Sequence, residues 1–187
     1  MFWADCRLRS TAYVDMTTYF IFGAFETFLP LYLVSIGIEV YLIGIIFAIQ
    51  VLSIALTKPF FGKIADVKNP VYQIMAGLML LGLSVFMIPF CSDIMLLLIL
   101  SLLSGLWMSL STVATTKYIA DIAKKEEIGA SMGALSSIMD IGHSSGPFVT
   151  GIVITASGYG AGFGMALILA VITTLYFGTM TIRSTKT

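Results

Sequence analysis

The sequence has little charge for its length. Only 11% of its 187 residues are Asp, Glu, Lys or Arg, whereas a soluble domain carries about 25%. Ten basic and ten acidic residues give a net charge of zero, so nothing favours a general attraction to nucleic acid. So few charges could not cover the surface of a soluble fold. The composition therefore excludes an ordinary soluble domain and favours a protein that folds in lipid.

Cysteine is also scarce, and a nucleotide-binding loop is missing. Cys6 and Cys91 are the only cysteines, too few for a disulfide framework or a metal cluster. The pattern G-x-x-x-x-G-K-[ST] does not occur, so nucleotide hydrolysis is not the expected energy source. We therefore predict no metal site and no cofactor.

Long apolar runs dominate the chain, which is 58% hydrophobic with a mean hydropathy of +1.00. A membrane-spanning helix needs about 20 mainly apolar residues. Six segments meet this requirement: 12–36, 41–61, 71–91, 94–119, 129–156 and 161–182. A lipid-facing barrel would instead show short alternating strands. We predict an all-α membrane protein in which residues 1–187 form one domain of six transmembrane helices.

The basic residues all fall on one side of this six-span path. They lie before the first span, around the second and fourth connectors, and after the sixth span. These residues are Arg7, Arg9, Lys58, Lys63, Lys68, Lys117, Lys124, Lys125, Arg183 and Lys186. Cytoplasmic loops hold the excess of Lys and Arg. The pattern predicts a plasma-membrane protein with both termini in the cytoplasm.

The second connector has an unusual composition for so apolar a chain. Residues 59–70 read "PFFGKIADVKNP", which combines charge with glycine and proline. We expect Pro59 and Gly62 to end or bend the second helix, and Gly62 to let a neighbouring backbone approach closely. The lysines are expected to anchor this turn at the cytoplasmic surface.

A second stretch, "MDIGHSSGPFVTGIVI" at 139–154, interrupts the fifth span. It contains Gly142, Gly146, Pro147 and Gly151. Together the two stretches resemble the major facilitator superfamily of secondary transporters. The spacing Gly62-x-x-x-Asp66 resembles the loop motif between the second and third helices of each half. The glycine–proline pair followed by a further glycine resembles the fifth-helix motif best known in proton-driven exporters.

The resemblance implies half of a twelve-helix fold. After Asp66 the family's loop usually continues with basic residues and a glycine, whereas this chain has "VKNP", as is more typical of the C-terminal half. Such a half consists of two inverted three-helix repeats, here about 12–91 and 94–182. Gly44 precedes Pro59 by fifteen residues and Gly133 precedes Pro147 by fourteen, which fits this repeat. A switch role for Asp66 is implied by the resemblance.

Polar residues inside the expected spans are the candidate site residues. An ionisable group at the bilayer centre costs about 2.5–3.5 kcal/mol, so it usually faces a cavity or a partner. Glu26 lies near the middle of the first span. At about 100° per residue it shares a face with Asp15 and Tyr19. We expect this face to line a cavity, with Glu26 binding a proton or a cationic substrate. The alternative is a protonated Glu26 hydrogen-bonded between helices.

Asp140 and His143 lie three residues apart in the fifth span and are predicted neighbours. Such a pair can hold and pass a proton because imidazole titrates near neutrality. The alternative is a structural hydrogen-bond network between helices. Gln50 shares a face of the second span with Ser53 and Thr57. It is a further candidate for substrate or proton coupling, although such side chains commonly hold membrane helices together.

These observations favour a secondary active transporter, or half of one. The expected activity is proton-coupled export of a small molecule by alternating access, with lipid as solvent. A second six-helix half, from a homodimer or a separate chain, would complete the substrate cleft. One alternative is a non-transporting half or fragment that acts as a membrane scaffold. A remote alternative is an intramembrane serine protease, but Ser144 and Ser145 lie on the same helix as His143, whereas such a site needs two helices. We therefore do not expect an enzyme.

Overall fold

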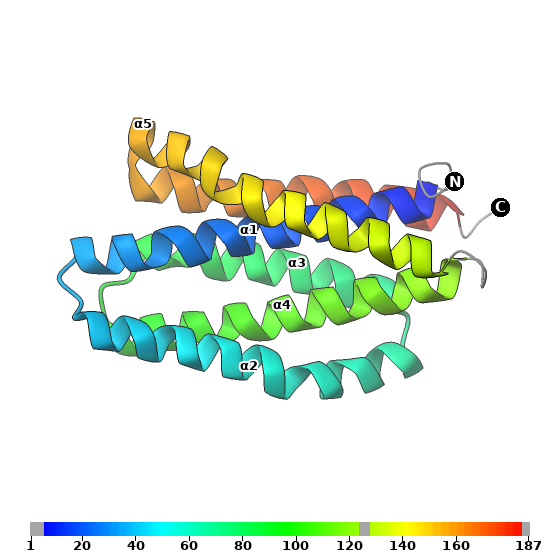
Figure 1. Cartoon of the computed structure of the whole chain (residues 1–187), viewed down its shortest axis with the longest axis horizontal. Helices are drawn as coiled ribbons and strands as arrows, with labels where there is room; N and C mark the ends of the chain where they lie inside the picture. Colours follow the sequence, from blue (N-terminus) through cyan, green and yellow to red (C-terminus); the bar gives the residue numbers. More distant parts are fainter. Residues whose placement is uncertain (1–5, 124–127, 185–187) are drawn as a thin grey trace.

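The computed structural model describes residues 6–123 and 128–184 and contains five long helices (Figure 1). They are α1 (Cys6–Ser35), α2 (Val40–Val67), α3 (Pro70–Met87), α4 (Ile94–Ile122) and α5 (Ile128–Ser184), and a short 3-10 helix, η2 (Ile88–Phe90), follows α3. The described residues contain no strand. All five helices are long and apolar enough to cross a membrane. The predicted all-α membrane fold class is confirmed.

Capping residues explain why the connections are short. Asn69 caps α3, where its side chain accepts a hydrogen bond from the backbone N–H of Val71, and Pro70 fills the first helical position. Asp93 caps α4 by accepting from two backbone N–H groups. Gly37, at φ 86°, makes the turn between α1 and α2. Each helix therefore starts within a few residues of the preceding one, and helices that follow one another in the sequence run in opposite directions (Figure 1).

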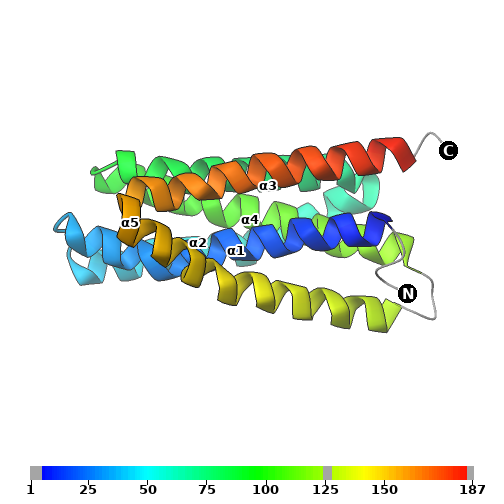
Figure 2. The ribbon, with the colours of Figure 1, turned by 90° about the horizontal axis from the view of Figure 1, so that it is seen from above.

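The six separate helices that the sequence predicts are not found, because the last two expected spans belong to α5. This helix has 57 residues and is interrupted at Gly158, where φ is 83° and ψ is 173°. Figure 2 shows that the chain reverses direction near the middle of α5. The residues between the last two expected spans, 157–160, thus form a sharp break at a glycine, not a loop. We call 128–157 the first arm and 159–184 the second arm.

The end of α2 also differs from expectation. The helix continues through Pro59 and Gly62 to Val67, so neither residue ends it, and the alternative that they bend it stays a prediction. A Cβ atom on Gly62 would meet only a side-chain methyl of Val113, at 3.8 Å. The expected close approach of a backbone at Gly62 is therefore wrong. The turn itself comprises Lys68 and Asn69.

The helices pack as a bundle in which α1 lies against α5, α2 against α4, and α3 against both α4 and α5. The core contains large apolar side chains of α1, α3 and α5, including Ile21, Phe25, Leu78, Phe163 and Phe177. Helix α2 is the least covered of the five. Cys6 Sγ lies 3.4 Å from Met180 Sδ, so the start of α1 lies beside the end of α5.

Candidate functional site

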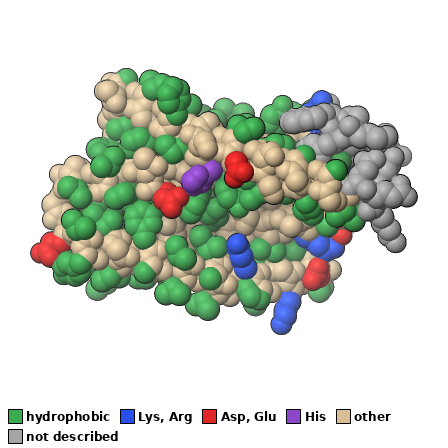
Figure 3. All heavy atoms as spheres, viewed as in Figure 1, with side chains coloured by type: hydrophobic (Ala, Val, Ile, Leu, Met, Phe, Trp, Pro, Cys, Tyr) green, Lys and Arg blue, Asp and Glu red, His purple; other side chains and the backbone are tan. Residues whose placement is uncertain are grey.

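An acidic side chain of α1 and the histidine of α5 are in contact on one face of the bundle. His143 Nε2 lies 3.1 Å from Glu26 Oε2, and the two side chains are 44% and 50% exposed. The Phe22 ring packs beside the imidazole, with centroids 5.9 Å apart. Figure 3 shows acidic side chains on both sides of the histidine. The pair joins residues 117 positions apart, so it forms only when α1 and α5 pack together.

Three glycines bring α1 and the first arm of α5 into backbone contact. A Cβ atom on Gly23 would overlap the carbonyl oxygen of His143, and Cβ atoms on Gly142 and Gly146 would overlap carbonyl oxygens of α1. Only glycine fits at these positions, which we call the glycine seam. Glu26 lies one turn after Gly23 and so emerges beside His143.

Asp140 is exposed one turn before the histidine. It lines an open hollow of about 610 Å³ together with Ile141, Ser144, Ser145 and Phe148. Within the described part of the chain, Asp140 makes no hydrogen bond or ion pair. The spacing along the helix predicts Asp140 as the neighbour of His143, but Glu26 of the facing helix is its hydrogen-bond partner. Three polar groups thus gather where α1 meets α5.

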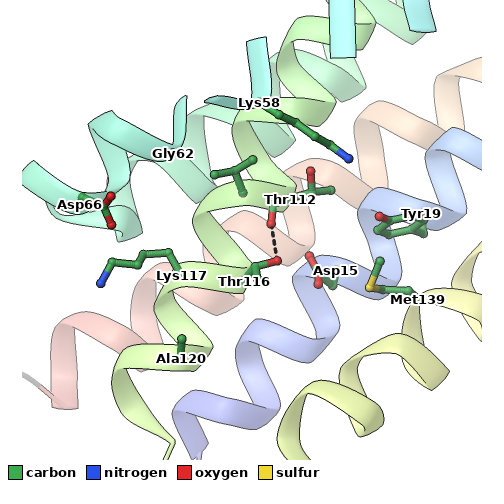
Figure 4. Close-up of a pocket in the computed structure, with 11 residues that line it drawn as sticks. Asp15, Tyr19, Lys58, Gly62, Asp66, Thr112, Thr116, Lys117, Ala120 and Met139 are labelled. Atoms are coloured by element: carbon green, nitrogen blue, oxygen red, sulfur yellow. Dashed lines mark hydrogen bonds between the residues drawn. The ribbon is translucent and has the colours of Figure 1, made fainter. Parts of the chain in front are cut away.

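A second pocket, of about 510 Å³, opens between α1, α2, α4 and the first arm of α5 (Figure 4). It is lined by Asp15, Tyr19, Lys58, Gly62, Asp66, Thr112, Val113, Thr116, Lys117, Ala120 and Met139. Asp15 is 1% exposed, the one buried Asp, Glu, Lys or Arg side chain among the described residues. The Thr115 hydroxyl donates to Asp15 Oδ1 at 2.6 Å. We call this the Asp15 pocket.

Asp15, which the sequence places on the same helix face as Glu26, is not among the predicted site residues. Asp15 could have been predicted, because an acidic residue within an apolar span is energetically costly and usually faces a cavity or a partner. The sequence does not show how deeply each acidic side chain is buried. Helix α4 covers α1 at Asp15, whereas Glu26 remains half exposed. The same helix face thus differs in environment along its length.

The other predicted candidates lie in several places. Tyr19 lines the Asp15 pocket and is within electrostatic range of both Asp15 and Asp140. Gly62 and Asp66 line the same pocket. Gln50 is instead buried between α2 and α4, where its Nε2 donates to the Ser104 hydroxyl at 3.4 Å.

The glycine–proline stretch lies within the first arm of α5. Pro147 is inside the helix, one residue after the end of the glycine seam. A Cβ atom on Gly151 would lie 3.1 Å from the ring of Phe28, so this glycine also faces α1. Across 6–123 and 128–184, no three His, Cys, Asp or Glu side chains gather closely enough to hold a metal ion.

A comparison with protein families matches residues 12–186 to the Major Facilitator Superfamily. The chain belongs to this superfamily. The match covers nearly the whole sequence, and it agrees with the five apolar helices. This superfamily member is therefore a multi-pass membrane protein of a transporter family.

Two relatives illustrate the likeness. The "Uncharacterized MFS-type transporter MJ1560" of Methanocaldococcus jannaschii is 28% identical over 137 residues, which are 73% of this chain and 36% of the relative. The "Quinolone resistance protein NorA" of Staphylococcus aureus (strain Mu50) is 28% identical over 129 residues, 69% of this chain and 33% of the relative. This major facilitator chain thus spans about a third of the length of the curated relatives it matches.

Proposed function

We propose that this chain is one half of a secondary transporter of the plasma membrane. It exports a small molecule by alternating access and couples the movement to protons. Membership of the superfamily supports transport, and the name of one relative, a quinolone resistance protein, favours export. The contact between Glu26 and His143 carries the proton-coupling part of the proposal.

We further propose that the chain crosses the membrane six times. A straight helix of 57 residues would be about 85 Å long, whereas the hydrocarbon core is only about 30 Å thick. The break at Gly158 lets each arm of α5 cross separately. Helices α1 to α3 and α4 to the second arm then form two inverted repeats. Both termini, and the basic residues, face the cytoplasm.

The polar face where α1 meets α5 has the chemistry of a coupling site. A carboxyl and an imidazole in contact can share one proton, and the proton leaves when a substrate or an opposing charge replaces it. Both side chains are about half exposed, so solvent and substrate can reach them. Asp140 supplies a second carboxyl on the same face. In the proposed mechanism, Glu26 holds the proton, His143 relays it, and Tyr19 and Asp140 extend the site.

A second six-helix half would cover this face and complete the cleft. The chain matches only about a third of the length of its relatives, so a further membrane-spanning unit is part of the proposal. In this arrangement Asp66, at the end of α2, acts as a switch. It pairs with a basic residue or a helix end in one conformation and releases it in the other. The glycine seam and Pro147 allow α1 and α5 to adjust between the two conformations.

Transport in proteoliposomes tests the proposal. The chain is reconstituted alone and together with the six-helix half of a full-length relative, and flux of a small-molecule panel is measured with and without a proton gradient. We expect gradient-dependent flux. The double variant Glu26→Gln, Asp140→Asn should abolish coupling while inserting normally into the membrane. Lys63→Gln, an exposed change away from the site, serves as the control.

Two outcomes would contradict different parts of the proposal. Unchanged coupling in the double variant would falsify the roles of Glu26 and Asp140. Absence of flux from the chain in both arrangements would favour the alternative of a membrane scaffold.

A further inference from the structure

The Asp15 pocket has the size of a small-molecule site. Its volume of about 510 Å³ falls within the range of roughly 300–1,000 Å³ that is typical for ligand pockets. Side chains from α1, α2, α4 and the first arm of α5 line it. It is separate from the exposed pair of Glu26 and His143, neither of which lines it.

Four charged side chains line the pocket: Asp15, Lys58, Asp66 and Lys117. Lys117 forms an ion pair with Asp121 on the same helix, and Asp66 is exposed to solvent. Figure 4 shows Asp66 and Lys117 at one end of the pocket. Asp15, which is buried, and Lys58 are the two charges left for a ligand.

Asp15 has no cationic partner among the described residues. Its hydrogen bond comes from the neutral hydroxyl of Thr115, and the side chain is 1% exposed. Burying a carboxylate is costly unless it is paired with a positive charge or neutralised. An ammonium group in the pocket would supply that charge. The floor of the pocket therefore favours a ligand with a protonated amine.

Lys58 provides the opposite charge at a different place. It extends from α2 toward the side of the pocket where Thr112 and Tyr19 lie, as Figure 4 shows. No hydrogen bond or ion pair of Lys58 is found in the described ranges. A lysine ammonium binds a carboxylate as a compact, flexibly held charge. The part of the pocket near Lys58 therefore favours a ligand with a negative group.

Tyr19, Val113 and Met139 form the aromatic and apolar part of the lining. They suit a flat apolar body and, in the case of Tyr19, a cation over its ring. We propose that the Asp15 pocket binds a small aromatic zwitterion, with its ammonium on Asp15 and its carboxylate toward Lys58. This assignment rests on the proposed function in one respect, since it names the class of molecule that the transporter carries.

Three probes that share an indole ring test the charge requirement. Tryptophan is a zwitterion, tryptophan methyl ester is a cation, and N-acetyltryptophan is an anion. Binding to the chain in lipid nanodiscs is measured by calorimetry at neutral pH. We expect tryptophan to bind best. Asp15→Asn should weaken the binding of tryptophan and of the ester by roughly tenfold or more. Lys58→Gln should weaken the binding of tryptophan but not that of the ester.

Matched controls separate the pocket from general charge effects. Glu39→Gln removes a negative charge and Lys63→Gln a positive charge at exposed positions outside the pocket. Both variants should leave the affinities for all three probes unchanged. Lys58 is itself exposed, which keeps the test valid even if Asp15→Asn fails to fold. Equal binding of the three probes, or tryptophan binding unaffected by Lys58→Gln, would overturn the proposal.

The binding measurements, together with the flux measurements in proteoliposomes, distinguish this inference from the proposed function. Selective binding without any flux would contradict transport but not the pocket. Proton-coupled flux of other molecules without selective binding would contradict the pocket but not transport.

Discussion

At the scale of single residues, the hydroxyl of Thr115 stabilises a buried acidic side chain. It is the hydrogen-bond donor to a carboxyl group that α4 has removed from solvent. Hydrogen bonds to buried charged or polar groups are expensive to lose, because the remaining partner stays desolvated. The contact also joins α1 to α4 across 100 positions of sequence. It therefore links the floor of the Asp15 pocket to the packing of the bundle.

Replacing this donor should destabilise the protein measurably. Thr115→Val keeps the shape of the side chain but removes the hydroxyl, and we expect a loss of about 1–3 kcal/mol, read as a lower thermal unfolding temperature in detergent. Thr116→Val is the control, because that exposed hydroxyl bonds only to a backbone carbonyl of its own helix. Equal effects of the two substitutions would contradict the role of Thr115.

The sequence identifies polar residues within spans, but it does not identify their partners. Glu26, Asp140 and His143 could be selected because each is costly in lipid. Spacing along one helix then gave Asp140 as the neighbour of His143. The observed partner is Glu26, because the crossing of α1 and α5 at Gly23 decides which side chains meet. Such a contact depends on packing between distant segments, which spacing within a helix cannot reveal.

At the scale of elements, the glycine seam sets how closely α1 and α5 approach. Gly146→Ala would force a methyl group against a carbonyl oxygen of α1, and overpacking of this kind costs about 1–3 kcal/mol. We expect a lower unfolding temperature and a weaker contact between Glu26 and His143. Gly133→Ala, on the same arm with open space around it, should instead stabilise the helix by about 0.5–1 kcal/mol. Equal changes in the two variants would argue against the seam.

The break in α5 makes a second prediction at this scale. Gly158 has a backbone conformation, φ 83° and ψ 173°, that is essentially confined to glycine and costs other residues about 1–3 kcal/mol. Gly158→Ala should therefore destabilise the protein, and thermal unfolding measures the loss. The nearby Gly160→Ala, where φ is not positive and no atom lies within 4 Å of the added group, should be tolerated. If both variants unfold at the same temperature, the break does not depend on Gly158.

The extent of each helix was only partly predictable. Hydrophobic runs locate all the apolar segments, because each needs about 20 residues to cross the membrane. They do not reveal that α2 continues past Pro59 and Gly62 to Val67, since charged residues are stable in a helix that reaches the headgroup region. They also do not show that a glycine can reverse α5 without a loop.

At the scale of the whole molecule, charge asymmetry and fold agree. Lys58 and Lys63 lie in the second half of α2, Lys68 lies in the turn after it, and Lys117 lies toward the end of α4. Figure 1 shows those two helix ends at the end of the bundle where α1 begins. The opposite end holds the turns at Gly37 and Asp93. Because cytoplasmic loops hold the excess of Lys and Arg, we predict that the end of the bundle with these lysines faces the cytoplasm.

Cysteine accessibility tests this orientation and the number of crossings together. In a background of Cys6→Ser and Cys91→Ser, single cysteines replace Glu39, Ser92 and Ser157 in one set and Lys68 and Asp121 in the other, all of them exposed positions. A membrane-impermeant maleimide added to intact cells should label the first set, and the second only after permeabilisation. Ser157→Cys is decisive. If α5 crossed once, this site would lie within the bilayer and resist labelling, and the two chain ends would face opposite compartments. Labelling of Ser157→Cys together with Glu39→Cys would show that the first arm of α5 crosses, and the reversal of the chain at Gly158 then directs the second arm back across the membrane (Figure 2).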